Sequence, residues 1–184
     1  MGKHTLSSRL AENVLGGREF RHYMCQVEER PDHEDPDYGD GHGTHVIGTI
    51  AAVDNETAAA INWAVDNGAH IISISLGWPA NHTKLYEACK NAYNQGALLI
   101  AAAGNENGSV CYPAAYDSVV AVGAVYPNDT RWEWSNFGPG LEFVSPGFDI
   151  YSTHLNEGYA LMSGTSMAVP HITAVAAFDL VFKN

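Results

Sequence analysis

The segment Asp40-Gly41-His42-Gly43-Thr44-His45-Val46 contains residue types suited to acid–base chemistry. Small residues flank His42 and an apolar run with helical spacing starts at Val46, so we expect the imidazole at a helix N-terminus. The positive helix end disfavours protonation, and a neutral imidazole suits a general base. Two histidines three residues apart, without a third ligand, do not make a metal motif. The segment predicts a general base, with a structural histidine as the alternative.

A second segment, Ser163–His171 (SGTSMAVPH), could supply a nucleophile. Gly164 permits a tight turn, and a helix of small and apolar residues follows it from Ser166. We expect Pro170 in the first helical turn, which puts the helix start close to Ser166. A serine at this position is most often an N-cap. The functional alternative is a nucleophile whose attack product is stabilised by the free N–H groups of the first turn.

A third segment, Ala101–Asn107 (AAAGNEN), comes at the end of a short apolar run of buried-strand length. An asparagine after glycine is ordinarily a turn residue. The side-chain NH₂ of Asn105 could instead donate to a developing oxyanion, provided that it faces Ser166. Base, nucleophile and oxyanion donor are together the groups that acyl transfer needs.

These segments need a framework, and the chain from residue 56 onward predicts one. Strands that are nearly all apolar, separated by helices of ten or more residues, indicate a parallel sheet covered on both faces. In such sheets functional groups collect at the carboxyl ends of the strands. The fold class is therefore α/β. The predicted elements are helices over 56–67, 84–95 and 166–182 and strands over 71–76, 97–103 and 118–125.

Composition excludes several classes of function. Lys and Arg number 9 and Asp and Glu 21, a formal net charge of −12, so no basic cluster is available for nucleic acid. No run of 18 apolar residues is present to span a membrane, and the first twenty residues lack the apolar core of a signal peptide. Three cysteines (Cys25, Cys89 and Cys111) without C-x-x-C spacing allow one disulfide at most and suggest no zinc or iron–sulfur site. We expect a single domain over 1–184.

Five segments, in their order along the chain, resemble the motifs of the subtilisin-like serine peptidases (subtilases), over residues about 10–182. They are DGHGTHVIGTIAA, ISLG, AAAGNEN, YPAAYDSVVAVGAV and SGTSMAVPH. The resemblance implies a three-layer α/β/α fold with a mainly parallel sheet and a serine endopeptidase activity. It implies His42 as the general base, Ser166 as the nucleophile and Asn105 as the oxyanion side chain.

The resemblance also implies a substrate-binding edge formed by Ser75, Leu76 and Gly77, with Gly104 as a further substrate contact. There, an extended protein or peptide substrate would pair with the chain by β-augmentation. A subtilase relative that binds extended peptides without cleaving them is the alternative. A third class, an unrelated α/β small-molecule binder, lacks a glycine-rich phosphate-binding motif.

The sequence departs from the family pattern at its triad acid. The family order is Asp, His, Ser, and the Asp segment would fall at or before Met1. Asp37 resembles a nearby structural acid, not the triad acid. A loop carboxylate such as Asp32 or Glu34 is the alternative source of the charge, and Asp40 is poorly placed to supply it. Without an acid, nothing fixes the His42 tautomer, so we expect impaired turnover.

Further segments of the family pattern are missing as well. We expect the region after Ala52, with its strand and tight calcium site, and the helices beyond Asn184 to be absent. The missing strands would lie inside the parallel sheet, which predicts marginal stability unless Ala11–Val27 re-forms a strand or a propeptide or complementing segment supplies one. We assign no metal ligand. Tyr112–Tyr116 and Glu142 resemble the surroundings of the family's weaker calcium site, with a plain turn as the alternative. The family resemblance favours secretion, and the lack of a signal peptide favours the cytoplasm.

Overall fold

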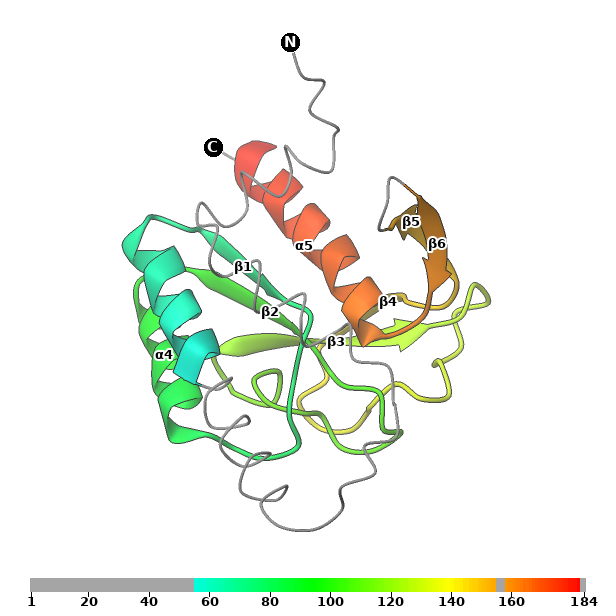
Figure 1. Ribbon diagram of the computed structural model, residues 1–184, viewed down its shortest axis with the longest axis horizontal. Coiled ribbons are helices and arrows are strands. Elements are labelled where there is room, and N and C mark those ends of the chain that lie inside the picture. Colours follow the sequence, from blue (N-terminus) through cyan, green and yellow to red (C-terminus); the bar gives the residue numbers. More distant parts are fainter. Residues whose placement is uncertain (1–54, 155–157, 183–184) are drawn as a thin grey trace, which may run out of the picture. The chain divides into compact units, whose positions relative to one another are not determined.

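Four short strands form a parallel sheet at the centre of the computed structural model, which describes residues 55–154 and 158–182 (Figure 1). The strands lie in the order β1-β2-β3-β4, and each neighbouring pair is parallel. The predicted mainly parallel sheet is confirmed. The strands are β1 (Ile71–Ile74), β2 (Leu98–Ala102), β3 (Val119–Val125) and β4 (Phe143–Pro146).

The two faces of the sheet have separate hydrophobic cores. Side chains alternate along a strand, so Leu99 and Ala101 of β2 join the core that contains the helix over 55–66 and α4 (Thr83–Asn94). Ile100 and Ala102 join the core that contains α5 (Thr165–Phe182). Figure 1 shows α4 beside the helix over 55–66, with α5 crossing the sheet separately. The three-layer α/β/α arrangement is therefore confirmed.

The element boundaries lie close to the predicted ones. The helices over 55–66 and Thr83–Asn94 each match their predicted range to within one residue. The strand predicted over 71–76 is shorter and ends at Ile74, which leaves Ser75, Leu76 and Gly77 as irregular chain beyond it. Local sequence patterns therefore predict these elements well.

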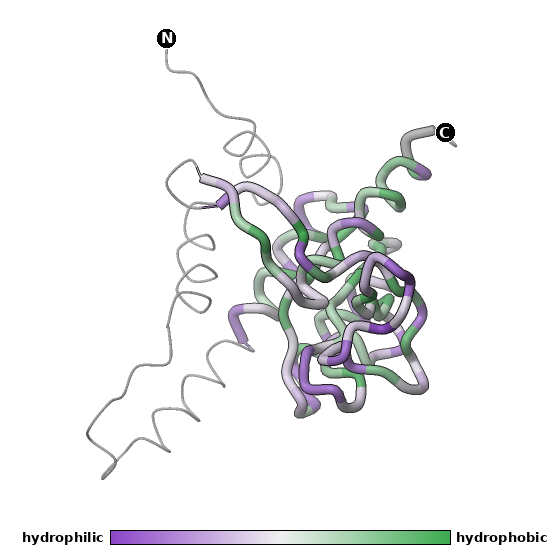
Figure 2. The backbone as a smooth tube through the Cα atoms, turned by 90° about the vertical axis from the view of Figure 1, so that its right-hand side faces the viewer, coloured by the Kyte–Doolittle hydropathy of each residue, from purple (hydrophilic) through white to green (hydrophobic). Residues whose placement is uncertain are grey.

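Helix α5 differs from its prediction in one respect. It starts at Thr165, beside the expected Ser166, but Pro170 is its sixth residue and lies beyond the first turn. The expectation that Pro170 lies in the first turn was wrong. Figure 2 shows hydrophobic residues along much of this helix, up to its end near the C-terminus.

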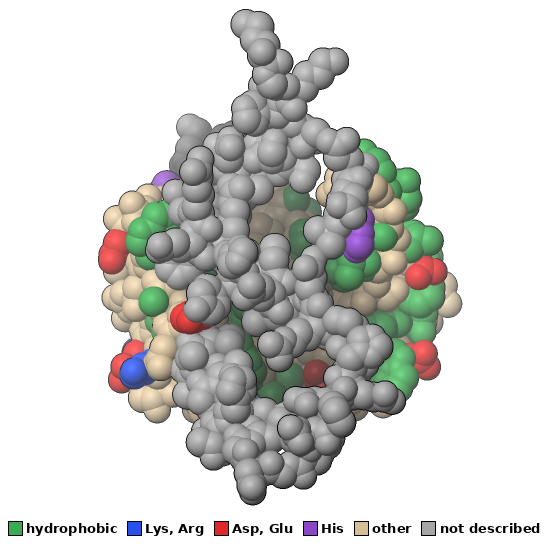
Figure 3. All heavy atoms as spheres, viewed as in Figure 1, with side chains coloured by type: hydrophobic (Ala, Val, Ile, Leu, Met, Phe, Trp, Pro, Cys, Tyr) green, Lys and Arg blue, Asp and Glu red, His purple; other side chains and the backbone are tan. Residues whose placement is uncertain are grey.

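The hairpin of β5 (Ile150–Thr153) and β6 (Tyr159–Met162) was not predicted from the sequence. Tyr151 and Tyr159 stack on it with ring centroids 5.3 Å apart, and both side chains are more than 60% exposed. Figure 3 shows hydrophobic side chains gathered on the right-hand side of the molecule, where Figure 1 places this hairpin. Alternation is weak in these four-residue strands, so their pattern gave no strand signal.

All described residues belong to one compact unit, Asp54–Asn184. A single domain over 1–184 stays a prediction, because residues 1–54 lie outside the described part of the chain. Over the residues that are described, no helix combines the length and the apolar character needed to cross a bilayer.

Candidate active site

Ser166 lies at the start of α5 and is bound to the chain just beyond β1. Its hydroxyl donates to the Ser75 carbonyl oxygen at 3.1 Å, and the Ser75 hydroxyl donates to the Ser166 carbonyl oxygen at 2.9 Å. The second bond has a cause in the sequence. Pro170 has no N–H to donate to the carbonyl four residues before it, which is that of Ser166. The Ser75 hydroxyl takes the place of the missing helical donor, so a proline inside α5 is accommodated.

Asn105 follows β2 and is held by the residue that precedes Ser166. The Asn105 side-chain oxygen accepts from the backbone N–H of Thr165 at 2.9 Å and from the Thr165 hydroxyl at 2.9 Å. The same hydroxyl accepts from the Gly104 N–H at 3.2 Å. Thr165 is fully buried. Because the amide oxygen is committed to Thr165, the orientation of the Asn105 side-chain NH₂ is set.

Two N–H donors next to Ser166 have no acceptor among the described residues. They are the side-chain NH₂ of Asn105 and the backbone N–H of Ser166, which lies in the first turn of α5 and has no helical partner. Both lie near Gly164, since a methyl group placed there would be 3.6 Å from Asn105 Nδ2 and 3.7 Å from Ser166 N. This pair of donors is suited to an anionic oxygen formed on an atom attached to Ser166 Oγ.

The predicted substrate-binding edge runs past the same serine. Within residues 55–154 and 158–182, no partner is found for the backbone N–H and C=O groups of Leu76 and Gly77. The chain then turns into a paired segment, where Trp78 and Tyr112 exchange both backbone hydrogen bonds at 2.7 and 2.8 Å. A Cβ at Gly77 would lie 3.0 Å from the Tyr112 carbonyl oxygen, so a larger residue there would require this paired segment to shift by a few tenths of an ångström. The edge can therefore accept hydrogen bonds from, and donate them to, an extended peptide.

The contacts above bring together four of the site residues that the sequence predicts: Ser75, Gly104, Asn105 and Ser166. His42 lies outside the described residues, so its role as the general base stays a prediction. Sequence reasoning missed Thr165. The motif that contains Ser166 includes it, but a threonine at a helix start has the ordinary interpretation of an N-cap.

The buried thiols near the sheet are not suited to nucleophilic chemistry. Burial raises the pKa of Cys89 from 9.0 to about 12. Burial, and then the nearby Glu106 carboxylate, raise the pKa of Cys111 from 9.0 to about 11. Both cysteines are free, and Cys25 lies outside the described residues. A thiol needs its thiolate form to react, so neither Cys89 nor Cys111 competes with Ser166 for the role of nucleophile.

The segment that resembles a weak calcium site forms a turn. The carbonyl oxygens of Cys111, Tyr112, Pro113 and Tyr116 each accept a backbone N–H at 2.7 to 2.9 Å. Within the described ranges, no group of three or more His, Cys, Asp or Glu side chains is placed to hold a metal ion. No step below uses a cation at this turn. A calcium ion at this turn stays a prediction.

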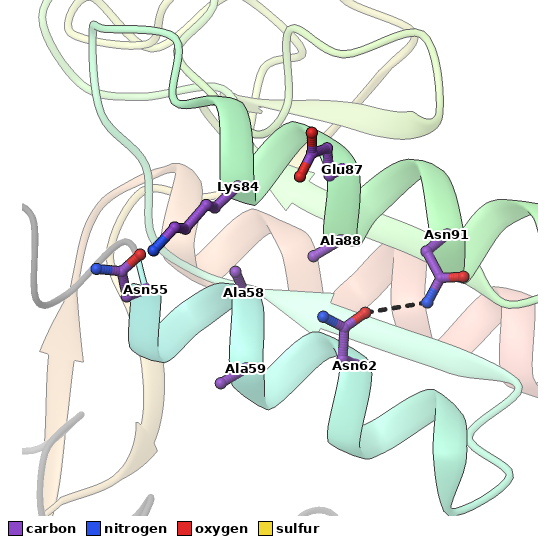
Figure 4. A pocket seen from close by; sticks show the side chains of 8 residues that line it. All are labelled: Asn55, Ala58, Ala59, Asn62, Lys84, Glu87, Ala88 and Asn91. Carbon is purple, nitrogen blue, oxygen red and sulfur yellow. Dashed lines mark hydrogen bonds between the residues drawn. The ribbon is translucent and has the colours of Figure 1, made fainter.

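A pocket of about 570 Å³ lies elsewhere, between the helix over 55–66 and α4 (Figure 4). Its lining includes Lys84 and Glu87 of α4, and Asn62 and Asn91 bridge the two helices at 3.0 Å. These helices pack on the face of the sheet opposite α5. The pocket therefore does not include Ser166.

A serine at the start of a helix, an asparagine after the neighbouring strand and a backbone edge that could pair with a peptide are together the arrangement of a subtilisin-like fold. The family model described as "Subtilase family" (peptidase family S8) matches residues 54–180, a range that includes Ser166 and Asn105 but not His42. The chain belongs to the subtilase family.

Individual relatives agree with this assignment. Subtilisin DY from Bacillus licheniformis is 40% identical over 175 residues, which cover 77% of this chain and 64% of that protein. Subtilisin Savinase from Lederbergia lenta is 37% identical over 194 residues, which cover 90% and 69% of the two chains. M-protease from Shouchella clausii is 37% identical, with 90% of this chain and 49% of that protein covered. The chain thus spans about half to two thirds of the length of these relatives.

Solved structures show the same likeness. The prenylagaramide maturation protease PagA matches with a TM-score of 0.65 at 35% identity, over 67% of this chain and 48% of that one. The self-cleaved protease domain of PatA matches with a TM-score of 0.65 at 34% identity, over 68% and 50%. The structural neighbours are therefore subtilisin-like proteases, which agrees with the predicted fold.

Proposed function

We propose that this chain carries the nucleophile, oxyanion site and substrate edge of a serine endopeptidase that cleaves protein or peptide substrates. The observation that carries the proposal is a pair of donors, Asn105 Nδ2 and Ser166 N, which both lie near Gly164 and have no acceptor among the described residues. A serine that served only as an N-cap would use its side-chain oxygen to accept a helical N–H. The Ser166 hydroxyl instead donates to Ser75, away from the helix.

In the proposed reaction, Ser166 Oγ forms a bond to the carbonyl carbon of the scissile peptide while His42 takes the hydroxyl proton. The carbonyl electron pair moves to oxygen, and the negative charge is stabilised by the Asn105 NH₂ and the Ser166 N–H. His42 then returns the proton to the amine as the carbon–nitrogen bond breaks. Water repeats these steps on the acyl-enzyme, releasing the acid and restoring Ser166.

Leu76 and Gly77 would hold the substrate chain during this reaction. Their backbone N–H and C=O groups have no partner among the described residues and can pair with an extended peptide, which fixes the scissile carbonyl near Ser166 by main-chain hydrogen bonds. Such pairing is independent of substrate side chains. The edge would therefore fix the position of the substrate backbone, and neighbouring pockets would select between substrate side chains.

The rate depends on whether an acid orients His42. In a subtilisin, loss of the triad acid alone lowers kcat by about 3 × 10⁴, against about 2 × 10⁶ for loss of the serine or the histidine. Both magnitudes were measured on that relative and give the scale for the family. We therefore propose that Ser166 can be acylated even where turnover is slow.

Covalent labelling tests this proposal. A fluorophosphonate incubated with the full chain should modify Ser166, as read by peptide mass spectrometry, and Ser166→Ala should take up no label. Ser152→Ala, which removes an exposed serine on β5, is the matched control and should be labelled like the wild type. The proposal fails if the folded wild-type chain takes up no label, or if labelling survives in Ser166→Ala.

A second candidate is supported by the backbone edge alone, because Leu76 and Gly77 have no backbone partner within the described ranges and peptide pairing there needs no catalytic group. In that case the chain is a subtilase relative that binds extended peptides without cleaving them. Calorimetry with extended peptides separates the two functions. Binding by both wild type and Ser166→Ala, with no labelling of the wild type, would favour the binding function, whereas labelling of Ser166 favours the peptidase.

A further inference from the structure

The loop that presents Asn105 is exposed and irregular. Gly104 has a φ of +104°, which glycine adopts freely, and Asn107 has a φ of +52°, which a residue with a side chain adopts at a small cost. Exposed loops of this kind usually sample several conformations. Thr165 binds the Asn105 side chain, but the Gly104 N–H is the one backbone group of this loop that it contacts among the described residues. Something else has to fix the remainder of the loop.

Asn136 is the buried side chain that does so. It is 1% exposed and comes from a segment about 30 residues further along the chain. Its side-chain oxygen accepts from the backbone N–H groups of Glu106 and Gly108, both at 2.9 Å. Its side-chain NH₂ donates to the Ala103 carbonyl at 3.0 Å, the Glu106 carboxylate at 2.7 Å and Cys111 Sγ at 3.3 Å. One amide thus satisfies donors and acceptors on both sides of Asn105.

Backbone contacts place Asn136 directly against the loop. The Asn136 N–H donates to the Gly104 carbonyl at 2.9 Å, and the Phe137 N–H donates to the Gly108 carbonyl at 2.9 Å. Gly104 leaves no room between the two segments. A Cβ there would lie 2.6 Å from Glu106 Oε2 and 2.8 Å from Cys111 Sγ, and closer still to Asn136 Nδ2. The loop therefore cannot move relative to Asn136 without breaking several buried hydrogen bonds.

From this geometry we infer that Asn136 is a positioning residue for the oxyanion site, acting through the backbone on either side of Asn105. This inference deepens the proposed function and rests on it. Thr165 sets the direction of the Asn105 amide, and Asn136 sets the location of the loop that carries it. A displacement of about 1 Å in a catalytic group can cost about 10²-fold in rate, so the location matters as much as the direction.

The test uses Asn136→Asp in the full chain. The carboxylate keeps an acceptor for the Glu106 and Gly108 N–H groups but loses both donors and faces the Glu106 carboxylate. The readout is fluorophosphonate inactivation of Ser166, resolved into the maximal rate kinact and the apparent affinity KI. We expect kinact to fall about 10- to 100-fold, with KI within about threefold, because the peptide edge at Leu76 and Gly77 is untouched.

A double-mutant cycle separates positioning from general structural support. Asn105→Ala should lower kinact by itself, on the scale of the 10²- to 10³-fold loss of kcat measured in a subtilisin for one oxyanion donor. In the Asn105→Ala background, Asn136→Asp should lower kinact by less than about threefold, because the residue through which it acts is already absent. Equal effects of Asn136→Asp in both backgrounds would overturn the inference.

Two further variants complete the experiment. Asn128→Ala removes a comparable turn asparagine, which binds Thr130 in an exposed loop, and should leave kinact unchanged. Asn136→Ser is the milder variant, and thermal unfolding establishes that each protein is folded. If neither Asn136 variant folds, Asn136 is a general structural residue and the inference fails. A wild-type chain that takes up no label contradicts the proposed function, and this is seen before any variant is compared.

Discussion

Helices α4 and α5 cover opposite faces of one sheet, and they are held there by different interactions. Helix α4 buries residues at spacings of three and four, which form one apolar face against β2, and its other face is polar. Helix α5 is apolar on nearly all sides, and an outward residue such as Val175 is 67% exposed. The buried residues of α4 are Leu85, Ala88, Cys89 and Ala92.

Helix α5 packs on the sheet as well, and it is held in addition by hydrogen bonds to the strands and to the chain just beyond β1. The Ser75 hydroxyl binds the Ser166 carbonyl, the Ser145 hydroxyl binds the Ala168 carbonyl at 2.7 Å, and the Ser73 hydroxyl meets Thr173 at 3.0 Å. Apolar packing tolerates small displacements, whereas a hydrogen bond fixes atoms to within a few tenths of an ångström. The comparison teaches that α4 chiefly contributes to stability, whereas the hydrogen bonds of α5 fix the location of its first turns, which include Ser166.

Leu85→Ala should have the largest effect on stability. Leu85 is completely buried on α4, so truncation is expected to lower the free energy of unfolding by about 2–5 kcal/mol. The labelling rate of Ser166 per folded molecule should stay unchanged, because α4 does not contact the site. Chemical denaturation and active-site titration measure the two quantities. If the free energy of unfolding and the labelling rate per folded molecule both fall, packing on α4 affects the site at the start of α5, which would contradict this prediction.

Cys89 gives the buried face of α4 a pH dependence. Burial raises its pKa from 9.0 to about 12, so the thiol stays neutral in the folded chain while it ionises in the unfolded chain above pH 9. The contribution of this thiol to the free energy of unfolding is therefore fully present below pH 9. It is lost as the pH rises to about 12, and the loss amounts to at most about 4 kcal/mol. Denaturation curves from pH 8 to 11 should therefore decline less steeply for Cys89→Ala. Parallel curves for the two proteins would contradict this.

Ser75→Ala should act on the start of α5. The Ser166 carbonyl loses its replacement donor, and the expected loss is about 1–3 kcal/mol of unfolding free energy. Unlike Leu85→Ala, this variant should also slow fluorophosphonate labelling of Ser166 in the folded fraction. Ser152→Ala provides the matched serine deletion on an exposed strand. Labelling at the wild-type rate in Ser75→Ala would show that the bond stabilises the helix without positioning the nucleophile.

Val175→Thr should have the smallest effect. The side chain lies on the exposed side of α5, so a polar replacement of similar shape is expected to change the free energy of unfolding by less than about 0.5 kcal/mol. Denaturant titration beside Leu85→Ala makes the contrast direct. A loss above about 2 kcal/mol would indicate that Val175 is covered in solution.

The elements that the sequence predicted are those with strong local patterns. Helix 84–95 was found because its apolar spacing repeats through three turns, and the strand at β2 because it is continuously apolar. Strand β4 and the hairpin were missed, since four-residue strands with mixed exposure carry little periodic signal. Patterns within ten residues are visible in one sequence, and tertiary pairing is not.

The site was predictable in its residue types but not in its supports. Ser166 and Asn105 belong to dense motifs, whereas Asn136 is one asparagine in a turn-rich stretch and contacts residues about 30 positions away. Thr165 lay beside the predicted nucleophile without a signal of its own. The mistake over Pro170 has the same origin, because the donor that compensates for it comes from Ser75, 91 residues away from Ser166.

The proline inside α5 has a consequence for how this helix opens. Fraying that starts near the C-terminal end meets, at Pro170, a place where the ladder of helical hydrogen bonds is already interrupted and the Ser166 carbonyl is bound by the Ser75 hydroxyl instead. The outer turns can therefore exchange their amide protons while the turn with Ser166 stays closed. We therefore expect the Ser166 hydroxyl to lie on the side of this interruption that opens last when the exposed end of the helix frays.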